Sequence, residues 1–380
     1  MPAILANQTP SAEHRHASKV EHASQARADA HRELPSNADC AAHLQLLEAF
    51  VALRQSVQLL AAAAEGSTPE RAWDLYCKRA VSRFEQWSTS AQRPAEQLPP
   101  VDVLMAWHAL MLHPKAYARF IELGGRLGLD GLNWSGIASS TGLNIDVKEL
   151  LESISSPAQQ QHTGIFTHRS PAGAALFTYD LAAAIARQFD FSQKMSRYAW
   201  LRSPAASSTL ARSRARYANF FRLIAAHPGA VMVPTLDVDL VWHTHQLAPA
   251  RYLAYSKKTA GRLIDHDDEI PSERLAALST DMQALWRDEF AEEYHVCMCW
   301  TCEADRAGVD AAVVADGLRA EETQAALPLA DLAFPRCDDC GSHPASCCPP
   351  AEGAADSGCG GGCGGGCGGE GGCGSCGAMK

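Results

Sequence analysis

Apolar side chains recur at helical spacing along residues 40–64. They fall on one face of a helix and include Leu46, Phe50, Leu53, Val57 and Leu60. A second helix is expected next, because Thr68-Pro69 is typical of a helix start. Another is expected from about Ser272 and should end in the cysteine-rich segment 297–302. The pattern therefore predicts a mainly α-helical core that begins near residue 39.

One short pattern occurs twice in this core. Residues 99–117 read PPVDVLMAWHALMLHPKAY, and residues 234–252 read PTLDVDLVWHTHQLAPARY. Eight of the nineteen positions are identical, and they include Trp107-His108 in the first copy and Trp242-His243 in the second. We interpret these segments, here called the Trp-His copies, as related halves of one helical core that spans residues 39–305.

The segment between the copies, about 131–192, has a different pattern. Two short stretches around Gly142 predict short helices, and residues 163–180 predict a hairpin that turns at residues 170–173. Two short helices and a hairpin are compatible with a winged helix. The favoured interpretation is a helix-plus-hairpin insertion that packs between the halves.

Both ends of the chain lack apolar periodicity. Residues 1–38 are polar and are predicted to be disordered. Residues 306–380 are predicted to form a flexible tail, because its end is mostly glycine and cysteine. Nine of the fourteen cysteines lie at or beyond Cys337, so they do not form a disulfide framework for the core.

Composition narrows the class of protein. A chain of 380 residues with 47% hydrophobic residues can bury a sizeable core. No apolar run is long enough to predict a membrane span, and the first residues do not read as a secretory signal, so we expect a cytoplasmic location. The net charge of −10 argues against a surface coated for nucleic acid, although it allows one local basic face.

The second Trp-His copy carries the densest set of reactive side chains. On a helix, Asp239 and His243 lie one turn apart on one face, so the carboxylate can fix the tautomer of the ring and raise its basicity. His243 and His245 would point to opposite sides, which argues against a His-x-His metal site. We expect His243 to act as a general base oriented by Asp239, with His108 facing the same cavity. Buried packing at the interface of the halves is the alternative.

A polar loop follows this copy. Residues 263–271 contain Asp265, His266, Asp267 and Asp268, and paired carboxylates can bind a guanidinium group through two parallel hydrogen bonds. We expect the loop to bind the cationic part of a substrate, together with Gln246 and Trp242. A solvated loop that caps the next helix is the alternative.

Residues 194–222 are basic, contain no acid, and are interleaved with aromatic residues. Such a stretch suits the phosphates of a nucleic acid, so Arg212, Arg214 and Arg216 are the predicted nucleic-acid contacts. The aromatic positions also fit the buried face of a helix, in which case these arginines cover its solvated side.

The segment around residues 295–302 carries a further candidate site. His295 with Cys297, Cys299 and Cys302 offers three thiols and an imidazole, a set that suits tetrahedral zinc. The spacing is not one of the common zinc patterns, so buried free thiols are the alternative.

The second copy, the Asp-rich loop and the Cys-x-Cys-Trp-x-Cys pattern together resemble the glycine-rich domain-containing-protein-like family of plants and fungi. The resemblance spans roughly residues 98–303 and implies an α-helical fold; the Gly-rich tail is similar to that of filamentous-fungal members. As a type of chain, the protein is also similar to fungal arginine-containing cyclodipeptide synthases, which join two tRNA-borne aminoacyl residues without ATP.

A functional hypothesis follows from these resemblances and from the motifs that the sequence lacks. It contains no P-loop, dinucleotide-binding or nucleophile-elbow motif, so an enzyme of this kind would take a substrate that is already activated. The hypothesis is a transferase of fungal-type secondary metabolism that acts on a small molecule or an aminoacyl-tRNA. A non-enzymatic metal- or partner-binding protein and a His/Asp metal-dependent enzyme are the alternatives.

Overall fold

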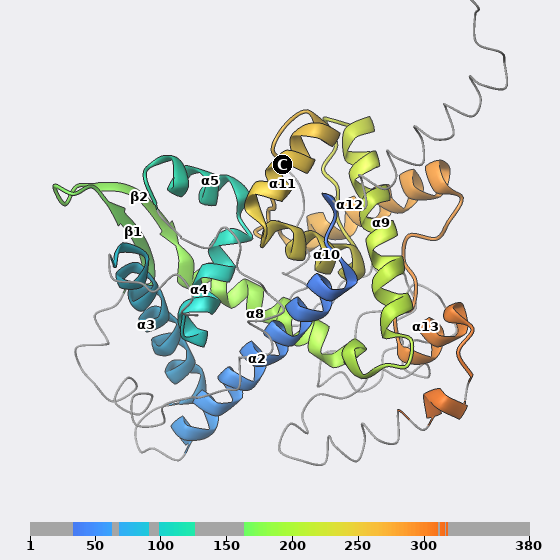
Figure 1. Cartoon of the computed structure of the whole chain (residues 1–380), viewed down its shortest axis with the longest axis horizontal. Helices are drawn as coiled ribbons and strands as arrows, with labels where there is room; N and C mark the ends of the chain where they lie inside the picture. The colour runs from blue at the N-terminus through green and yellow to red at the C-terminus, as the bar shows by residue number, and fades with distance from the viewer. Residues whose placement is uncertain are drawn as a thin grey trace, which may run out of the picture.

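The computed structural model describes residues 33–62, 68–90, 99–125 and 163–310, together with 312–315 and 317. In this part of the chain the fold is mainly α-helical, as the sequence predicts, and its sheet is one two-stranded hairpin (Figure 1). Most of the predicted disordered segment 1–38 and of the predicted tail 306–380 lies outside the described residues.

Each Trp-His copy belongs to a longer series of helices. The first series is α2 (Asn37–Ala62), α3 (Pro69–Thr89), α4 (Val101–Met111) and α5 (Pro114–Glu122). The second series is α8 (Leu181–Tyr198), α9 (Ala206–Ala226), α10 (Leu236–Gln246) and α11 (Pro249–Ala260). In both, two long helices lead to a short Trp-His helix, and the helix after it starts with a proline. The interpretation of the copies as related halves therefore extends to the helices on either side of them.

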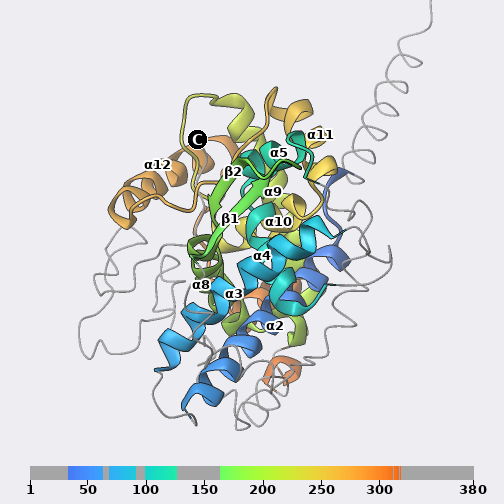
Figure 2. The same ribbon diagram turned by 90° about the vertical axis from the view of Figure 1, so that its left-hand side faces the viewer.

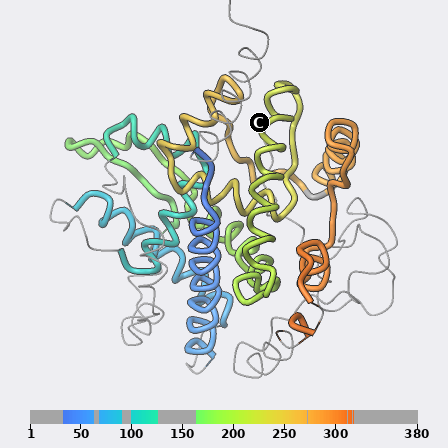
Figure 3. Tube along the Cα trace, turned by 45° about the vertical axis from the view of Figure 1, so that its right-hand side comes forward, coloured from blue at the N-terminus to red at the C-terminus, as the bar shows by residue number. Residues whose placement is uncertain are grey.

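The two series pack into each other. Helix α2 lies against α8 at the centre of the molecule, where Figures 1 and 2 show the two helices crossing. Helix α8 also packs on α3 and α4 of the first series, whereas α2 packs on α9 and α10 of the second. Figure 3 shows α2 running beside α9. Because the first helix of each half contacts the second and third helices of the other, neither half has a core of its own.

Local signals explain several helix boundaries. Thr68 caps α3, because its side chain accepts a hydrogen bond from the backbone N–H of Arg71, and Pro69 occupies the first turn. Pro114 and Pro249 likewise occupy the first turns of α5 and α11. These prolines separate each Trp-His helix from the next, because the residue before a proline is disfavoured in helical conformation.

The insertion contains the predicted hairpin. Strand β1 (Ile165–Arg169) pairs antiparallel with β2 (Ala175–Asp180). The turn contains Gly173 at φ 86°, a value that favours glycine. Phe166 is buried between Phe84 and Phe120, so the hairpin covers one side of α3 and α5. The two short helices predicted around Gly142 lie outside the described residues.

The last part of the core differs from the prediction in one respect. Helix α12 (Ser272–Phe290) starts where it is expected, but it does not reach the cysteines. It ends at Ala291, which adopts the left-handed conformation at φ 53°. The cysteines instead precede and begin α13 (Trp300–Ala307), where Cys299 is the N-cap residue. Among the described residues, none of the helices combines the length and apolar character that a membrane crossing requires.

Matching aspartates of the two copies form ion pairs with arginines. Asp102 of α4 pairs with Arg83 of α3, at 2.9 Å between Oδ2 and Nη1. Asp237 of α10 pairs with Arg216 of α9, at 2.8 Å between Oδ2 and Nε. In each half, the pair attaches the Trp-His helix to the helix before it. The second pair is the more deeply buried, since both of its partners are almost inaccessible to solvent.

The substitution Asp237→Ala should therefore destabilise the fold strongly. It leaves the Arg216 guanidinium buried without its carboxylate, a change that costs about 3–5 kcal/mol. The matched control is Glu289→Gln, because Glu289 pairs with Arg222 of the same helix α9 at an exposed position; an exposed pair contributes less than about 1 kcal/mol. Urea unfolding of both variants measures the difference. Equal losses in the two variants would contradict this assignment.

Candidate functional site

Helix α10 is buried on every side. All of its residues from Leu236 to Gln246 are inaccessible or nearly so, including two aspartates and two histidines. Such side chains are rarely buried unless they are paired or functional. The helix is enclosed because α9 of its own half and α2 of the other half pack on it, and His266 from the segment between α11 and α12 contacts it.

Three side chains converge at the centre of this region; they are called the Asp–His–His cluster below. Asp239 and His243 lie one turn apart on α10, and His266 enters from residues 263–271. Asp239 Oδ1 lies 3.2 Å from His243 Nε2 and 3.5 Å from His266 Nε2. The two Nε2 atoms lie 2.9 Å apart. All three side chains have an exposed fraction of 0%.

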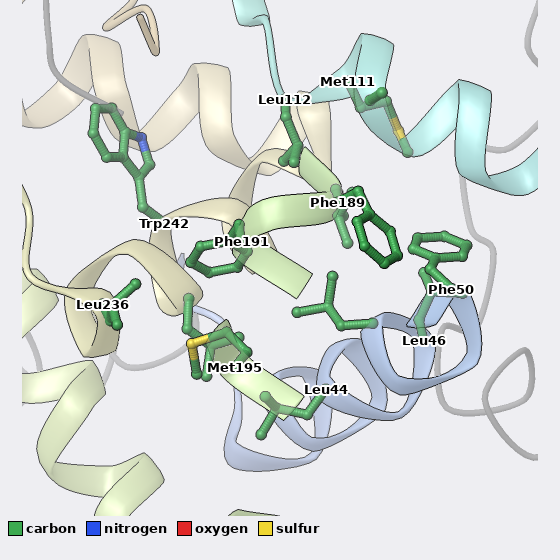
Figure 4. Close-up of a cluster of buried hydrophobic side chains, with 14 of the residues drawn as sticks. Leu44, Leu46, Phe50, Met111, Leu112, Phe189, Phe191, Met195, Leu236 and Trp242 are labelled. Atoms are coloured by element: carbon green, nitrogen blue, oxygen red, sulfur yellow. The ribbon is translucent and has the colours of Figure 1, made fainter. Parts of the chain in front are cut away.

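Aromatic rings hold the two imidazoles of the cluster in place. The Phe191 ring of α8 lies 4.4 Å from the His243 ring, and the Trp242 ring lies 5.0 Å from that of His266 (centroid distances). Figure 4 shows Phe191, Leu236 and Trp242 within the surrounding hydrophobic core. The cluster is therefore a polar group enclosed by apolar side chains.

The electrostatics of the cluster favour an ionised carboxylate. Burial alone would raise the pKa of Asp239, but the adjacent His243 and His266 lower it to about 2. Burial lowers the pKa of His243 despite the opposing charge of Asp239. For His266, burial also acts to lower the pKa, but Asp239 together with Asp268 raises it above its usual value. A proton in the cluster is therefore held more firmly by His266 than by His243.

A second imidazole pair lies beside the cluster and joins the two halves. His43 of α2 contacts His108 of α4, at 2.9 Å between their Nε2 atoms, and Thr244 of α10, at 2.9 Å between Nδ1 and Oγ1. The Thr244 hydroxyl donates to the carbonyl of Leu240 at 2.7 Å. It must then accept from His43 Nδ1, so that His43 Nε2 accepts from His108 Nε2. His108 and His243 thus belong to separate imidazole pairs.

The Asp-rich loop is engaged mainly with the chain itself. Asp268 is buried and accepts from Arg187 Nε at 2.8 Å and from Gln188 Nε2 at 3.0 Å. Asp265 Oδ1 accepts from the backbone N–H of Lys115 at 3.1 Å, and Asp267 Oδ1 accepts from that of Glu269 at 3.1 Å. The guanidinium that this loop binds in the structure is that of Arg187.

The other predicted substrate-binding residues have structural contacts. Trp242 Nε1 donates to the hydroxyl of Tyr252 at 2.9 Å, and that hydroxyl donates to the carbonyl of Ile264 at 2.8 Å. This chain of hydrogen bonds attaches the start of the Asp-rich loop to α10 and α11. Gln246 is buried at the end of α10. Binding of substrate by these residues stays a prediction.

The three arginines predicted to meet nucleic acid contact other parts of the chain. Arg212 binds Glu303 of α13 and lies 3.4 Å from Asp237. Arg216 binds Asp237 and the carbonyl of Tyr294. Arg214 contacts the carbonyl of Pro35 and the side chain of Asn37. These contacts account for the position of the three side chains without a nucleic acid.

The structure brings the core cysteines together. The sulfur atoms of Cys297, Cys299 and Cys302 lie within 4.8 Å of one another, and those of Cys297 and Cys299 are 3.4 Å apart. His295 does not join them, because its Nε2 lies 2.9 Å from the hydroxyl of Ser279. The group can provide three thiolates to a soft metal ion, so zinc at these cysteines stays a prediction.

Sequence reasoning missed several members of this region. His43 lies on the apolar face of a long helix, where nothing marks it as a polar contact. Arg187, which neutralises Asp268, also comes from a different helix. His113 lies inside the first Trp-His copy and could have been noticed there; its Nε2 is 3.6 Å from Asp268.

Comparison with known proteins gives a partial match. The family model described as "Glycine-rich domain-containing protein-like" matches residues 134–254. Glycine-rich domain-containing protein 1 of Arabidopsis thaliana is 32% identical over 216 residues, which cover 52% of this chain and 25% of that protein. Glycine-rich domain-containing protein 2 of the same plant is 28% identical over 240 residues, 58% of this chain and 29% of that protein.

The chain is therefore similar to this family and spans between a quarter and a third of the length of these relatives. No solved structure matches it significantly. The matched segment 134–254 contains Asp239 and His243, but it excludes His266 and the first Trp-His copy.

The buried His43–His108 pair predicts that the stability of the fold depends on pH. Burial lowers the pKa of His108 to about 3, so the folded state keeps this ring neutral where the unfolded chain, with a pKa near 6.5, binds a proton. Stability should consequently fall as the pH drops from about 6.5 towards 3, by up to about 1.4 kcal/mol per pH unit for this ring. Urea unfolding between pH 5 and 7 measures the slope, which should be smaller for His108→Gln. An identical slope in the variant would contradict the assignment.

Proposed function

We propose that this chain is an enzyme that transfers a preactivated group, and that the Asp–His–His cluster is its reacting centre. The observation that carries the proposal is the convergence of a carboxylate and two imidazoles, which arrive from distant segments and are fully buried. Packing alone favours apolar residues at such positions. Perturbed titratable groups that gather in a protein interior are typical of functional sites.

The cluster offers an acceptor for a proton. Asp239 is ionised and His243 is neutral near pH 7, because burial and the adjacent carboxylate set their pKa values in those directions. A neutral imidazole beside a carboxylate is the usual arrangement for removing a proton from an attacking amine. His266, whose pKa is raised, is the group to return a proton to the leaving oxygen.

The proposed donor is an aminoacyl ester of tRNA, and the proposed product is an arginine-containing cyclodipeptide. The α-amine of one aminoacyl group attacks the ester carbonyl of the other, an amide bond forms, the ester C–O bond breaks, and the leaving tRNA oxygen takes the proton of the amine and becomes a hydroxyl. A second attack of the same kind closes the ring. The absence of a familiar ATP motif from the sequence supports a donor that is already activated. The similarity to the glycine-rich domain family does not indicate a reaction.

The structure changes which residues serve such a substrate. Arg212 and Arg216 are engaged in ion pairs that attach α9 to α10 and α13, so the proposal does not use them to bind tRNA. Asp265 and Asp267 are only partly buried, and the proposal assigns them to the guanidinium of a substrate arginine. Because the cluster is inaccessible to solvent, the substrate reaches it after residues 263–271, which carry His266, have moved.

A non-enzymatic binding role is the second candidate. It is favoured by the complete burial of the cluster, which suits a site that holds an ion or stabilises the fold better than one that exchanges large substrates. In this case the Trp-His copies are packing elements, and the cysteines of the core and tail bind metal ions or a partner. Formation of a small-molecule product distinguishes the two candidates.

Replacement of the proposed base should abolish product formation. We expect His243→Ala and Asp239→Asn to reduce it by about a hundredfold or more, as removal of a positioned acid–base group typically does. The measurement is small-molecule profiling of a clean fungal or bacterial host that expresses each variant, followed by assay of the purified chain with charged tRNA. The control is His227→Gln, which alters a histidine at the end of α9 that is not a member of the cluster.

Two results would count against the proposal. Product formed at the wild-type level by a folded His243→Ala variant would exclude the cluster as reacting centre. A wild-type chain that is folded and soluble yet yields no product in the host or with charged tRNA would favour the binding role.

A further inference from the structure

We infer that the Asp–His–His cluster binds one divalent transition-metal ion through Asp239 Oδ1, His243 Nε2 and His266 Nε2. The inference deepens the proposed function, because it names the cofactor of the same site. It rests on that function only for the reaction that the ion would serve. Binding of the ion itself follows from the geometry of the three side chains.

The spacing of the three atoms fits a shared ion. Their mutual distances are 2.9, 3.2 and 3.5 Å. An ion bound by imidazole nitrogen and carboxylate oxygen has bonds of about 2.1 Å. Ligand atoms on such an ion are separated by about 3.0 Å when they are adjacent in an octahedron and about 3.4 Å in a tetrahedron, by simple geometry from that bond length. The observed separations span these values.

The carboxylate of Asp239 calls for a cation. It is fully buried, and neither of its oxygens completes a hydrogen bond with a described residue. A buried charge is costly unless it is paired or coordinates a metal. The neighbouring Asp237 meets this requirement through the Arg216 guanidinium, whereas no arginine or lysine forms an ion pair with Asp239 among the described residues.

The two imidazoles point the same ring atom at the same place. Two Nε2 atoms that face each other can share a single N–H, so one nitrogen at most donates. An ion accepts both lone pairs at once, and each ring is then neutral with its proton on Nδ1. The Nδ1 atoms of both rings are buried and complete no hydrogen bond with a described residue. Phe191 and Trp242 fix the ring planes instead.

The donor set indicates which ions fit. Two imidazoles and one carboxylate suit Fe²⁺, Mn²⁺, Co²⁺ and Zn²⁺, and differ from the thiolate set of Cys297, Cys299 and Cys302. In the described part of the chain, no further carboxylate, imidazole or thiol joins the three ligands. A three-ligand site keeps positions for water or substrate. With an ion bound, His243 Nε2 would be a ligand rather than the base, and the ion would supply an acidic water ligand in its place.

The test is metal binding by the chain of 380 residues. The purified protein is stripped with a chelator under reducing conditions and titrated separately with Co²⁺ and Mn²⁺. Thiolate-bound Co²⁺ shows an intense sulfur-to-metal absorption that nitrogen- and oxygen-bound Co²⁺ lacks, and Mn²⁺ disfavours thiolates altogether. A Cys297→Ser/Cys299→Ser/Cys302→Ser variant removes the thiols of the core, so that the two clusters are separated.

The variants are chosen so that folding and binding can be told apart. Asp239→Asn keeps the shape of the side chain and removes one ligand, and a cooperative melting transition of the metal-free variant shows that it is folded. The matched control is Asp102→Asn, which alters the buried aspartate that α4 places opposite Arg83. His243→Ala and His266→Ala test the other two ligands.

We expect the wild type, the triple cysteine variant and Asp102→Asn to bind one Mn²⁺ ion per chain, and the ion should raise their melting temperature. Asp239→Asn, His243→Ala and His266→Ala should bind it at least about tenfold more weakly, with no rise in melting temperature. Unchanged affinity in a folded Asp239→Asn variant, or no binding by the triple cysteine variant, would overturn the inference. A chain that binds the ion but forms no product would refute the proposed reaction and leave the metal site intact.

Discussion

The burial of two carboxylates within three residues of one helix is the constraint on which the second half of the structure depends. Both Asp237 and Asp239 are inaccessible to solvent, and each requires compensation of its charge. For Asp237 the compensation is the Arg216 guanidinium, which attaches α9 to α10. For Asp239 the compensation comes from the His243 and His266 imidazoles and from any ion that they bind. The contact with His266 places residues 263–271 against α10. Asp237 thus stabilises the packing of α9 on α10, whereas Asp239 forms the centre of the Asp–His–His cluster.

The two halves differ at the position that matters most for chemistry. The aspartate that pairs with an arginine is present in both copies, as Asp102 and Asp237, and both pairs are formed. Asp239 has Leu104 as its counterpart in the first copy, and Leu104 lies in the hydrophobic core. The first half therefore has the Asp–Arg ion pair alone, whereas the second half has both the ion pair and the Asp–His–His cluster.

Local sequence patterns predicted the features that are set by residues close together in the chain. The helix predicted from residue 40, the helix after Thr68, the hairpin and the Asp239–His243 pair follow from spacing along one segment, and the structure contains all four. The two short helices expected around Gly142 lie outside the described residues. The position of His266 depends on how a loop returns to α10 after α11, and periodicity contains no information about that path. The same limit applies to His43, which reaches the site because α2 packs across the other half.

In the basic stretch, residues 194–222, the sequence predicted the buried helix face but not the partners of its arginines. Its aromatic positions predicted a buried helix face, and Tyr217, Phe220 and Phe221 are indeed fully buried. The spacing could not show that Asp237 and Glu303 lie opposite Arg212 and Arg216, because these acids come from other helices. A run of like charges on one helix therefore says little about solvent exposure until the partners from the rest of the chain are known.

The two imidazole pairs have the same Nε2–Nε2 distance but different hydrogen-bond partners. In each, the Nε2 atoms lie 2.9 Å apart and the rings are buried. The His43–His108 pair is complete, because the Thr244 hydroxyl sets the tautomer of His43 and one N–H serves the contact between the rings. The His243–His266 pair has no such hydroxyl and faces a carboxylate without hydrogen bonds from the described residues. When both rings are neutral, Asp239 Oδ1 and the two Nε2 atoms share a single proton, and a cation at their centre would pair with all three at once. The same Nε2–Nε2 separation is thus a complete hydrogen-bonded contact in the His43–His108 pair, whereas in the His243–His266 pair it suits two ligands of one ion.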